Sequence, residues 1–358
     1  MVHNRQQILV GSKPAKMHSM IWLFLFSSLA AILIAAEIFT NALEHLGERL
    51  KISEGVTGSL FAAVGTALPE TLVPVLALVA GTGDPQLNQE IGVGAIFGAP
   101  LMLSTLVISL TGLVVIGQRG AGGAITPEPS GLRRDLNVFL CAFSLAALGL
   151  LVPPQWADAG LLRGLLAAVL VLIYFIYVLL TLRHSAALVD QGHATEAHKP
   201  AFLSRLGLPD NLLVILLQLG VGLAVLVAGA KGFIFVVHQL SDTFGVSALL
   251  LSLLIIPVAT ELPENVNSVL WIRRRKDTLA IGNITGAMVF QGTTLPALGL
   301  LLTPWQARPV VVAAITVTMV SVVWLRLLTA RGTLKVWHLG VNGLLYATYV
   351  AMAVGGFV

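Results

Sequence analysis

Ten long apolar stretches, separated by short polar segments, make up most of the chain. A helix needs about 20 residues, and at least about 17, to cross the roughly 30 Å hydrocarbon core of a bilayer. Every stretch meets that length, and together they cover residues 20–46, 54–80, 88–117, 136–152, 159–182, 211–239, 247–272, 278–303, 309–328 and 336–357. The pattern therefore predicts an all-α polytopic membrane protein with ten transmembrane helices.

The second half of this pattern repeats the first. Glu264 lies 194 positions after Glu70, and a shift of that size, adjusted by one residue in the following loop, aligns further positions. The aligned sets are residues 66–70 with 260–264, Glu37 with Lys231, Ile91 with Ile284, and Phe97 with Phe290. Spans one to five therefore correspond to spans six to ten. Because five is an odd number, the second half must be inverted in the bilayer.

Inverted repeats are a transporter architecture, in which the binding site lies between the repeats near the bilayer midplane. We predict a first five-helix repeat at residues 1–182 and a second at 211–358. The polar segment between them, residues 183–210, contains three histidines. We interpret it as a solvated cytoplasmic linker rather than as a metal site.

The composition excludes a soluble globular protein. Apolar residues make up 56% of the chain and charged residues only 11%, whereas about a quarter of a typical soluble domain is charged. Cys141 is the single cysteine, which excludes an internal disulfide and a multi-cysteine metal site.

The distribution of basic residues predicts the orientation of the chain. Of the 21 Lys and Arg residues, fifteen lie in loops opposite the termini, five lie on the terminal side and Lys231 lies within span six. By the positive-inside rule, both termini face the non-cytoplasmic side of a plasma or inner membrane, and the basic charge implies no nucleic-acid partner. The basic tail with residues 21–36 also has the form of a signal peptide. Because the helical pattern continues through Glu37 and Asn41, we predict a retained first span.

Two glutamates lie deep within apolar stretches, Glu70 in span two and Glu264 in span seven. A carboxylate at that depth costs at least about 2.5 kcal/mol, so it is retained where it faces protein, water or an ion. Prolines remove a backbone hydrogen bond and free a carbonyl one turn earlier, so we expect both helices to break at the glutamates. The prolines are Pro69 and Pro74 in one span, and Pro257 and Pro263 in the other. The alternative is that the glutamates are packing acids, protonated or paired with Lys231, but their duplication at matched positions argues against it.

Oxygen atoms around the two glutamates form a candidate cation site. Calcium takes about six to eight hard oxygen ligands, and magnesium, which gives up its water reluctantly, fits such a cage less well. The predicted ligands are Glu70, Glu264, Thr66, Thr260, Gln291 and Glu261. Glycines in spans three and eight let these helices pack closely against the broken ones. They are Gly92, Gly94 and Gly98 in span three, and Gly282, Gly286 and Gly292 in span eight.

The two motifs and the glycine-rich helices after them resemble the two alpha-repeats of the cation/calcium exchanger superfamily, most closely those of sodium/calcium exchangers. The matching segments are Gly-Thr-Ala-Leu-Pro-Glu at 65–70, Ala-Thr-Glu-Leu-Pro-Glu at 259–264 and Gly-Asn-Ile-Thr-Gly at 282–286. The resemblance implies ten helices, termini outside, and alternating access in which the first and sixth helices slide across the rest. It also implies that Glu70 and Glu264 are the central calcium ligands, with Thr66 and Thr260 beside them.

The chain departs from the family pattern at positions that bear on the counter-ion. Ala67 and Glu261 stand where the family usually has a serine, and Pro74 and Ser268 stand four residues after the glutamates. The Gly-Ser-Asn pattern of the family's third helix is replaced in both repeats. Most side-chain oxygens that the family uses for sodium in the first repeat are therefore missing. Glu261 lies three residues before Glu264 on the same helix face, and two like charges so close favour a proton on one of them.

These observations predict a sodium/calcium antiporter that works by alternating access, with calcium exchange for protons through Glu261 as the alternative. A passive cation channel is a further alternative, because it also uses buried acids. Glu261, Glu37, Lys231 and Ser268 are candidates for coupling or gating, although Glu37 and Lys231 equally fit an ion pair that fixes two helices. Motifs of membrane-embedded enzymes, such as His-Glu-x-x-His, are missing from the sequence. We therefore predict no enzyme activity and no cofactor, only the transported calcium and sodium or protons.

Overall fold

The computed structural model describes residues 13–49, 68–80, 84–153, 155–189, 200–244, 247–329 and 332–358. The helices of the first half are α1 (Lys13–Arg49), α4 (Leu68–Ala80), α5 (Pro85–Met102), the π-helical turn η2 (Leu103–Val107), α6 (Ile108–Arg119), α7 (Pro129–Leu148), the 3-10 turn η3 (Gly149–Leu151) and α8 (Ala159–Val189). They are followed by α9 (Phe202–Arg205), α10 (Leu212–Phe244), α11 (Ala248–Thr260), α12 (Leu262–Arg273), α13 (Asp277–Leu302), α14 (Pro309–Leu328) and α15 (Val336–Val354). Two short strands, β1 (Ala124–Ile125) and β2 (Leu334–Lys335), pair antiparallel with Ala124 opposite Lys335.

Seven of the described helical segments are long and apolar enough to cross a membrane. Shorter apolar helices at Glu70–Val79 and Ala248–Val258 occupy parts of the predicted spans two and seven. The protein is therefore a helical membrane protein, as the apolar pattern predicts. The count of ten spans in two inverted repeats stays a prediction.

Span seven is broken, although not at Glu264, where the sequence predicts the break. Helix α11 ends at Thr260 and α12 begins at Leu262, so the break lies at Glu261, three residues before Glu264. Pro263 has no N–H to donate, which explains why the two helices do not continue as one. In span two, α4 begins at Leu68 and continues through Pro74. The break predicted at Glu70 is therefore wrong, because the helix is continuous through Glu70.

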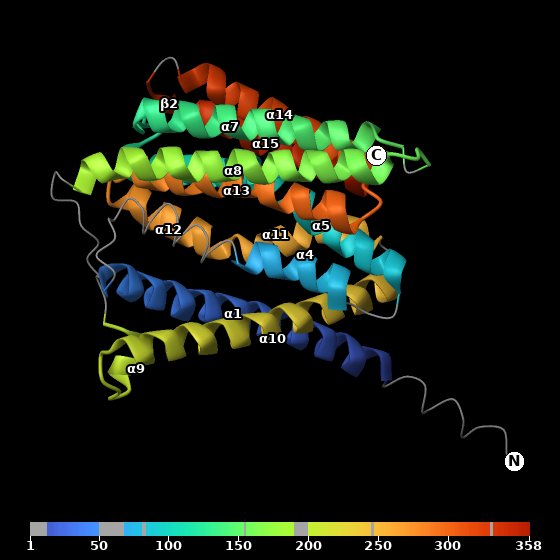
Figure 1. Ribbon diagram of the computed structural model, residues 1–358, viewed down its shortest axis with the longest axis horizontal. Coiled ribbons are helices and arrows are strands. Elements are labelled where there is room, and N and C mark those ends of the chain that lie inside the picture. Colours follow the sequence, from blue (N-terminus) through green and yellow to red (C-terminus); the bar gives the residue numbers. More distant parts are fainter. Residues whose placement is uncertain are drawn as a thin grey trace, which may run out of the picture.

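The two halves of the chain are interlocked. The long helix formed by α5, η2 and α6 belongs to the first half but packs against α14 and α15 of the second. Helix α13 of the second half packs in turn against α7 and α8 of the first, and these helices lie together at the top of Figure 1. Polar side chains reinforce one of these contacts, because Ser321 Oγ and Asn342 Nδ2 donate to the Ser104 carbonyl at 2.6 and 2.8 Å. Each half thus completes the core of the other, and we call the interlocked helices α5–α8 and α13–α15 the frame.

Helices α1 and α10 form a separate pair that crosses below the frame in Figure 1. Their backbones approach closely at glycines, because a Cβ atom at Gly229 would lie only 2.9 Å from the Ile32 side chain. Small residues are the usual means by which membrane helices reach such contact. An apolar cluster that includes Ile32, Phe233, Val73 and Ala95 joins the pair to α4 and α5.

Ion pairs hold the two ends of the long α5–α6 helix to the second half of the chain. At the end of α6, Arg119 donates from Nη1 and Nη2 to Asp277 Oδ2 and Oδ1 at 2.8 and 2.6 Å. The N–H of Thr126 donates to the same carboxylate at 3.0 Å. Near the start of α5, Glu90 Oε1 lies 2.6 Å from Arg308 Nη1. The axial position of this helix is therefore fixed at both ends.

We predict that Asp277→Asn destabilises the protein by about 3 kcal/mol, because it removes one partner of a largely buried ion pair. Burial alone would raise the pKa of Asp277, but the hydrogen bonds from Arg119 and Thr126 lower it below its ordinary value of 3.8. A carboxyl with a lowered pKa stabilises the fold above the pKa of the unfolded chain, and loses that contribution as the pH falls through the folded pKa. The stability difference should therefore be full at neutral pH and shrink below about pH 4.

The measurement is unfolding by titration with a denaturing detergent, for the unmodified protein and for Asp277→Asn, at several pH values. The exposed Asp158 supplies the matched control, Asp158→Asn, which should change little. Equal stability of Asp277→Asn and the unmodified protein at pH 7 would contradict the assigned role of the ion pair.

Candidate cation site

Buried polar side chains gather at the starts and ends of the short helices. Glu70 is only 2% exposed and lies in the first turn of α4, where the positive end of the helix dipole favours a carboxylate. Thr260 and Glu261, at the break between α11 and α12, are 1% and 0% exposed. Helix α4 packs against α11 and α13. The structure thus brings the helix that carries Glu70 to the elements that line the break.

Two predicted ligands, Thr66 and the side chain of Glu264, lie outside the described residues. The backbone of Glu264 belongs to the first turn of α12. The approach of the Glu70 and Glu264 carboxylates, on which the predicted calcium site depends, therefore stays a prediction.

Gln291 and Glu261 contact each other directly. Gln291 Nε2 donates to Glu261 Oε1 at 2.7 Å, and both side chains are fully buried. The other end of the amide, Gln291 Oε1, is buried and accepts no hydrogen bond from the described residues. A buried acceptor of this kind normally has a partner, and a cation is a suitable one. The hydroxyl of Thr260 donates to Ile256 O at 3.1 Å, which leaves lone pairs on its oxygen for another ligand.

Ser268 holds two helices together. It is fully buried on α12, donates to Ala280 O at 3.3 Å and accepts from Asn283 Nδ2 at 3.2 Å. These bonds connect α12 to α13, the helix that carries Gln291. Glu37 and Lys231 differ from this group, because their side chains are exposed on α1 and α10.

Two glycines of α5 pack closely against the broken span, as expected. A Cβ atom at Gly98 would lie 2.5 Å from the Leu253 carbonyl and 2.6 Å from Pro257 Cγ, and one at Gly94 would lie 2.5 Å from Ser252 Cβ. Helix α5 therefore touches the backbone of α11 just before the break. On α13, Gly292 faces Phe139 of α7 rather than a broken helix. A Cβ atom at Gly286 would lie 3.7 Å from the Tyr177 hydroxyl of α8, and one at Gly282 would have no described atom within 4 Å.

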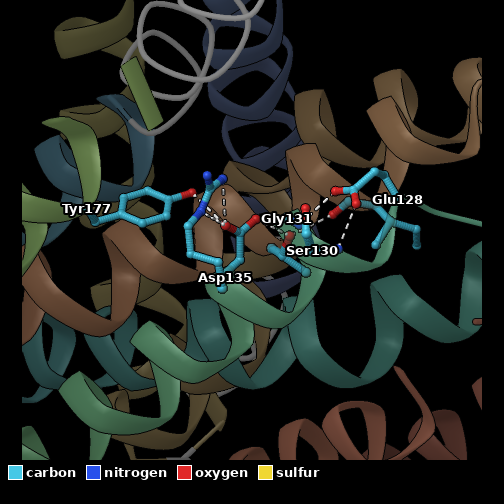
Figure 2. Close-up of polar contacts among 8 residues, drawn as sticks. Glu128, Ser130, Gly131, Asp135 and Tyr177 are labelled. Atoms are coloured by element: carbon cyan, nitrogen blue, oxygen red, sulfur yellow. Dashed lines mark hydrogen bonds and ion pairs between the residues drawn. The ribbon is translucent and has the colours of Figure 1, made fainter. Parts of the chain in front are cut away.

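One buried acid, Asp135, was missed by the sequence analysis. It is 4% exposed on α7, and it accepts hydrogen bonds from Thr285 Oγ1 at 2.8 Å and Tyr177 OH at 3.2 Å. Arg134 Nη2 lies 3.3 Å from the same carboxylate, and Figure 2 shows Tyr177 and Asp135 pointing toward each other. The apolar run of span four begins only at residue 136, so the hydropathy pattern leaves Asp135 outside the predicted span. It joins α7, α8 and α13 within the frame.

The true start of α7 explains that error. Glu128 caps the helix, because its carboxylate accepts from the N–H groups of Ser130 and Gly131 at 2.8 and 2.7 Å (Figure 2). Partial burial by itself would raise the pKa of Glu128, but these backbone hydrogen bonds lower it below its usual value. Pro129 occupies the first helical position, which suits its fixed φ angle. The polar first turns of α7 therefore extend the helix beyond its apolar run.

The sequence is similar to a known protein family and to a bacterial inner membrane protein. The family model described as "Sodium/calcium exchanger protein" matches residues 20–183 and 214–355. The inner membrane protein YrbG of Escherichia coli (strain K12) is 23% identical over 285 residues, which cover 80% of this chain and 81% of YrbG.

Two solved structures share the fold. The crystal structure of the H+/Ca2+ exchanger CAX superposes with a TM-score of 0.73 at 15% sequence identity. The aligned region covers 93% of this chain and 82% of the CAX chain. The structure of the sodium-calcium exchanger NCX_Mj superposes with a TM-score of 0.61 at 18% sequence identity, and the aligned region covers 92% of this chain and 97% of the NCX_Mj chain.

We predict that Gly98→Ala disturbs the broken span. The added Cβ atom would collide with the backbone carbonyl of Leu253, which has no rotamer in which to move away. Overpacking of this kind costs about 1–3 kcal/mol, and it should also displace the residues after α11 and weaken calcium binding. Gly117→Ala is the control, since Gly117 is an exposed helical glycine with nothing within 4 Å of its added Cβ. Calcium binding and thermal stability of Gly98→Ala equal to those of Gly117→Ala would refute the close contact.

Proposed function

Because the chain belongs to the sodium/calcium exchanger protein family, we propose that it is an antiporter that moves calcium across the membrane in exchange for a monovalent cation. The observation that carries this proposal is the buried break at Glu261, where Gln291 is hydrogen-bonded to a carboxylate and keeps its own oxygen free of described donors. Polar and ionisable side chains within a bilayer cost free energy, so they are usually kept for function. Their concentration around one helix break supports a site for a permeating ion.

The proposed calcium site uses oxygen ligands from both repeats. Glu70 and Glu264 supply the central carboxylates, and Thr260, Thr66 and Gln291 supply neutral oxygens. Calcium prefers such hard oxygens at about six to eight positions and tolerates irregular geometry. The full burial of Thr260 and Gln291 supports this role, because a ligand oxygen shielded from water loses little by binding an ion.

The division into a frame and a pair supports alternating access. We propose ten spans in two inverted repeats with both termini on the non-cytoplasmic side, and motion of α1 and α10 across the frame. The apolar contacts between α1, α10 and α4 support this motion, because hydrophobic contact is not directional and allows one surface to slide over another. Glu37 and Lys231, which are exposed on the pair, are proposed to act in gating.

Two counter-ions are candidates. Sodium agrees with the description of the family. A proton is favoured by Glu261, because this third acid is fully buried beside Gln291 and stands where the family usually has a serine.

We expect Glu70→Gln and Glu264→Gln each to abolish calcium exchange while the protein still inserts and folds. Each change removes one charged ligand and keeps the size of the side chain. Calcium uptake into proteoliposomes is the measurement, with binding of radioactive calcium to the purified protein beside it. Glu48→Gln, at an exposed position of α1, should behave as the unmodified protein. Tight calcium binding retained in both variants would rule out the proposed site.

The counter-ion is tested by imposing a sodium gradient and a pH gradient separately in the same vesicles. If Glu261 carries the coupling proton, a pH gradient alone drives uptake, and Glu261→Gln flattens the pH dependence of exchange. Uptake driven only by sodium, with an unchanged pH profile in Glu261→Gln, would leave sodium as the counter-ion. Flux that does not saturate and needs no opposing ion would instead indicate a channel.

A further inference from the structure

A network of amide hydrogen bonds joins α1, α9 and α10 where the pair meets the end of the linker. Gln218 Nε2 on α10 donates to Asn41 Oδ1 at 2.9 Å and to the carbonyl of Ile38 at 3.0 Å, both on α1. Gln218 is 0% exposed and Asn41 is 6% exposed. Two helices from opposite halves of the chain are thus connected by a buried side-chain amide.

The oxygens of the same two amides bind the linker. Asn41 Oδ1 accepts from the N–H of Phe202 at 3.1 Å, and Gln218 Oε1 accepts from the N–H of Leu203 at 3.1 Å. The first N–H groups of a helix have no acceptor within the helix, and Ala201 at the N-cap of α9 makes no side-chain capping bond. The amides of α1 and α10 therefore cap α9. We call Asn41 and Gln218, with these four bonds, the amide clasp.

Further contacts on either side of the clasp reinforce it. A Cβ atom at Gly222, one turn after Gln218, would lie 3.1 Å from Phe39 Cβ and 3.2 Å from its backbone N. Beyond the clasp, Arg49 at the end of α1 lies 3.6 Å from Asp210 Oδ1, just before α10. Figure 1 shows α9 beside the corresponding ends of α1 and α10.

The clasp and the apolar interface resist movement differently. Hydrogen bonds require fixed distances and angles, so α1 cannot shift along α10 without breaking the clasp. The apolar contacts of the pair with α4 and α11 impose no such geometry. The easier motion is therefore a shift of α1, α9 and α10 together against α4 and α11, which pack in turn on the frame.

We infer that Asn41 and Gln218 are positioning residues that make α1, α9 and α10 one moving body, so that the end of the linker travels with the pair during exchange. This inference rests on the proposed alternating access. The linker can therefore regulate exchange, because a partner that binds residues 200–210 and prevents their movement also prevents the movement of α1 and α10.

The test measures distances between spin labels in the full-length protein in vesicles, with and without calcium. Native Cys141, which is exposed on α7, provides a label on the frame. Exposed positions provide the others, through Leu206→Cys next to α9 and Val225→Cys on α10. The expected result is that the 141–206 and 141–225 distances change together with calcium. The 206–225 distance is measured in a protein that also carries Cys141→Ser, so that only these two positions are labelled. Its distribution should be narrow and its mean should not change with calcium. A 206–225 distance that changes as much as 141–225 would overturn the inference.

Removal of the clasp completes the test. Gln218→Met keeps the shape of the side chain and deletes its hydrogen bonds, and Asn41→Leu does the same from α1. Either variant should broaden the 206–225 distances and slow calcium exchange about tenfold, with half-saturating calcium unchanged, as expected when a mutation affects motion rather than binding. Gln118→Met, exposed on α6, is the control, and the swapped pair Asn41→Gln with Gln218→Asn should restore part of the rate. Narrow 206–225 distances in both clasp variants would refute the inference.

A failure of the proposed function gives a different result. If calcium changes no distance and no exchange is measured, but the 206–225 distance is narrow and broadens in Gln218→Met, the antiport proposal falls and the clasp still unites the three helices.

Discussion

The break at Glu261 places a buried carboxylate inside a bundle that is otherwise apolar, while the Glu261 N–H still donates to Pro257 O at 2.9 Å and its carbonyl accepts from the Asn265 N–H at 3.0 Å. A carboxylate at bilayer depth is retained only where it faces protein, water or an ion. The surrounding elements meet that requirement. Helix α5 presses its glycines against α11 on one side, while α13 supplies the amide of Gln291 and joins α12 through Ser268 on the other. Much of the remaining packing holds these covering helices in place.

The interlocking of the two halves provides that support. Because the long α5–α6 helix packs on α14 and α15, and α13 packs on α7 and α8, the helices that line the break cannot separate without dismantling the core of the other half. Ion pairs at Asp277 and Glu90 fix the ends of α5–α6. The pair α1–α10 stands outside this scheme and meets α4 and α11 through apolar side chains. This arrangement suits a transporter in which the pair moves while the frame holds the ion site in place.

The acids of the frame and the acid at the break have different partners. Asp135, Asp277 and Glu90 each lie next to an arginine, so their charge is balanced within the protein. Glu261 accepts a hydrogen bond from the amide of Gln291, which fixes the direction of one carboxylate oxygen. The acids beside arginines stabilise the fold, whereas Glu261 lies at the break that we propose to carry transport.

The amino-acid sequence by itself determined the membrane-embedded helical character, the family and the presence of a break in span seven, because hydropathy and proline act over a few neighbouring residues. It also placed Glu261 and Gln291 in one predicted site, although their hydrogen bond spans 30 positions. Sequence reasoning missed Asp135, since its apolar stretch begins one residue later and only the cap at Glu128 shows that the helix starts earlier. The interlocking of the halves, the ion pair of Arg119 with Asp277 and the amide clasp were decided by the tertiary structure alone. These contacts join side chains more than 150 positions apart, and no local pattern records which distant helices become neighbours when apolar surfaces are buried.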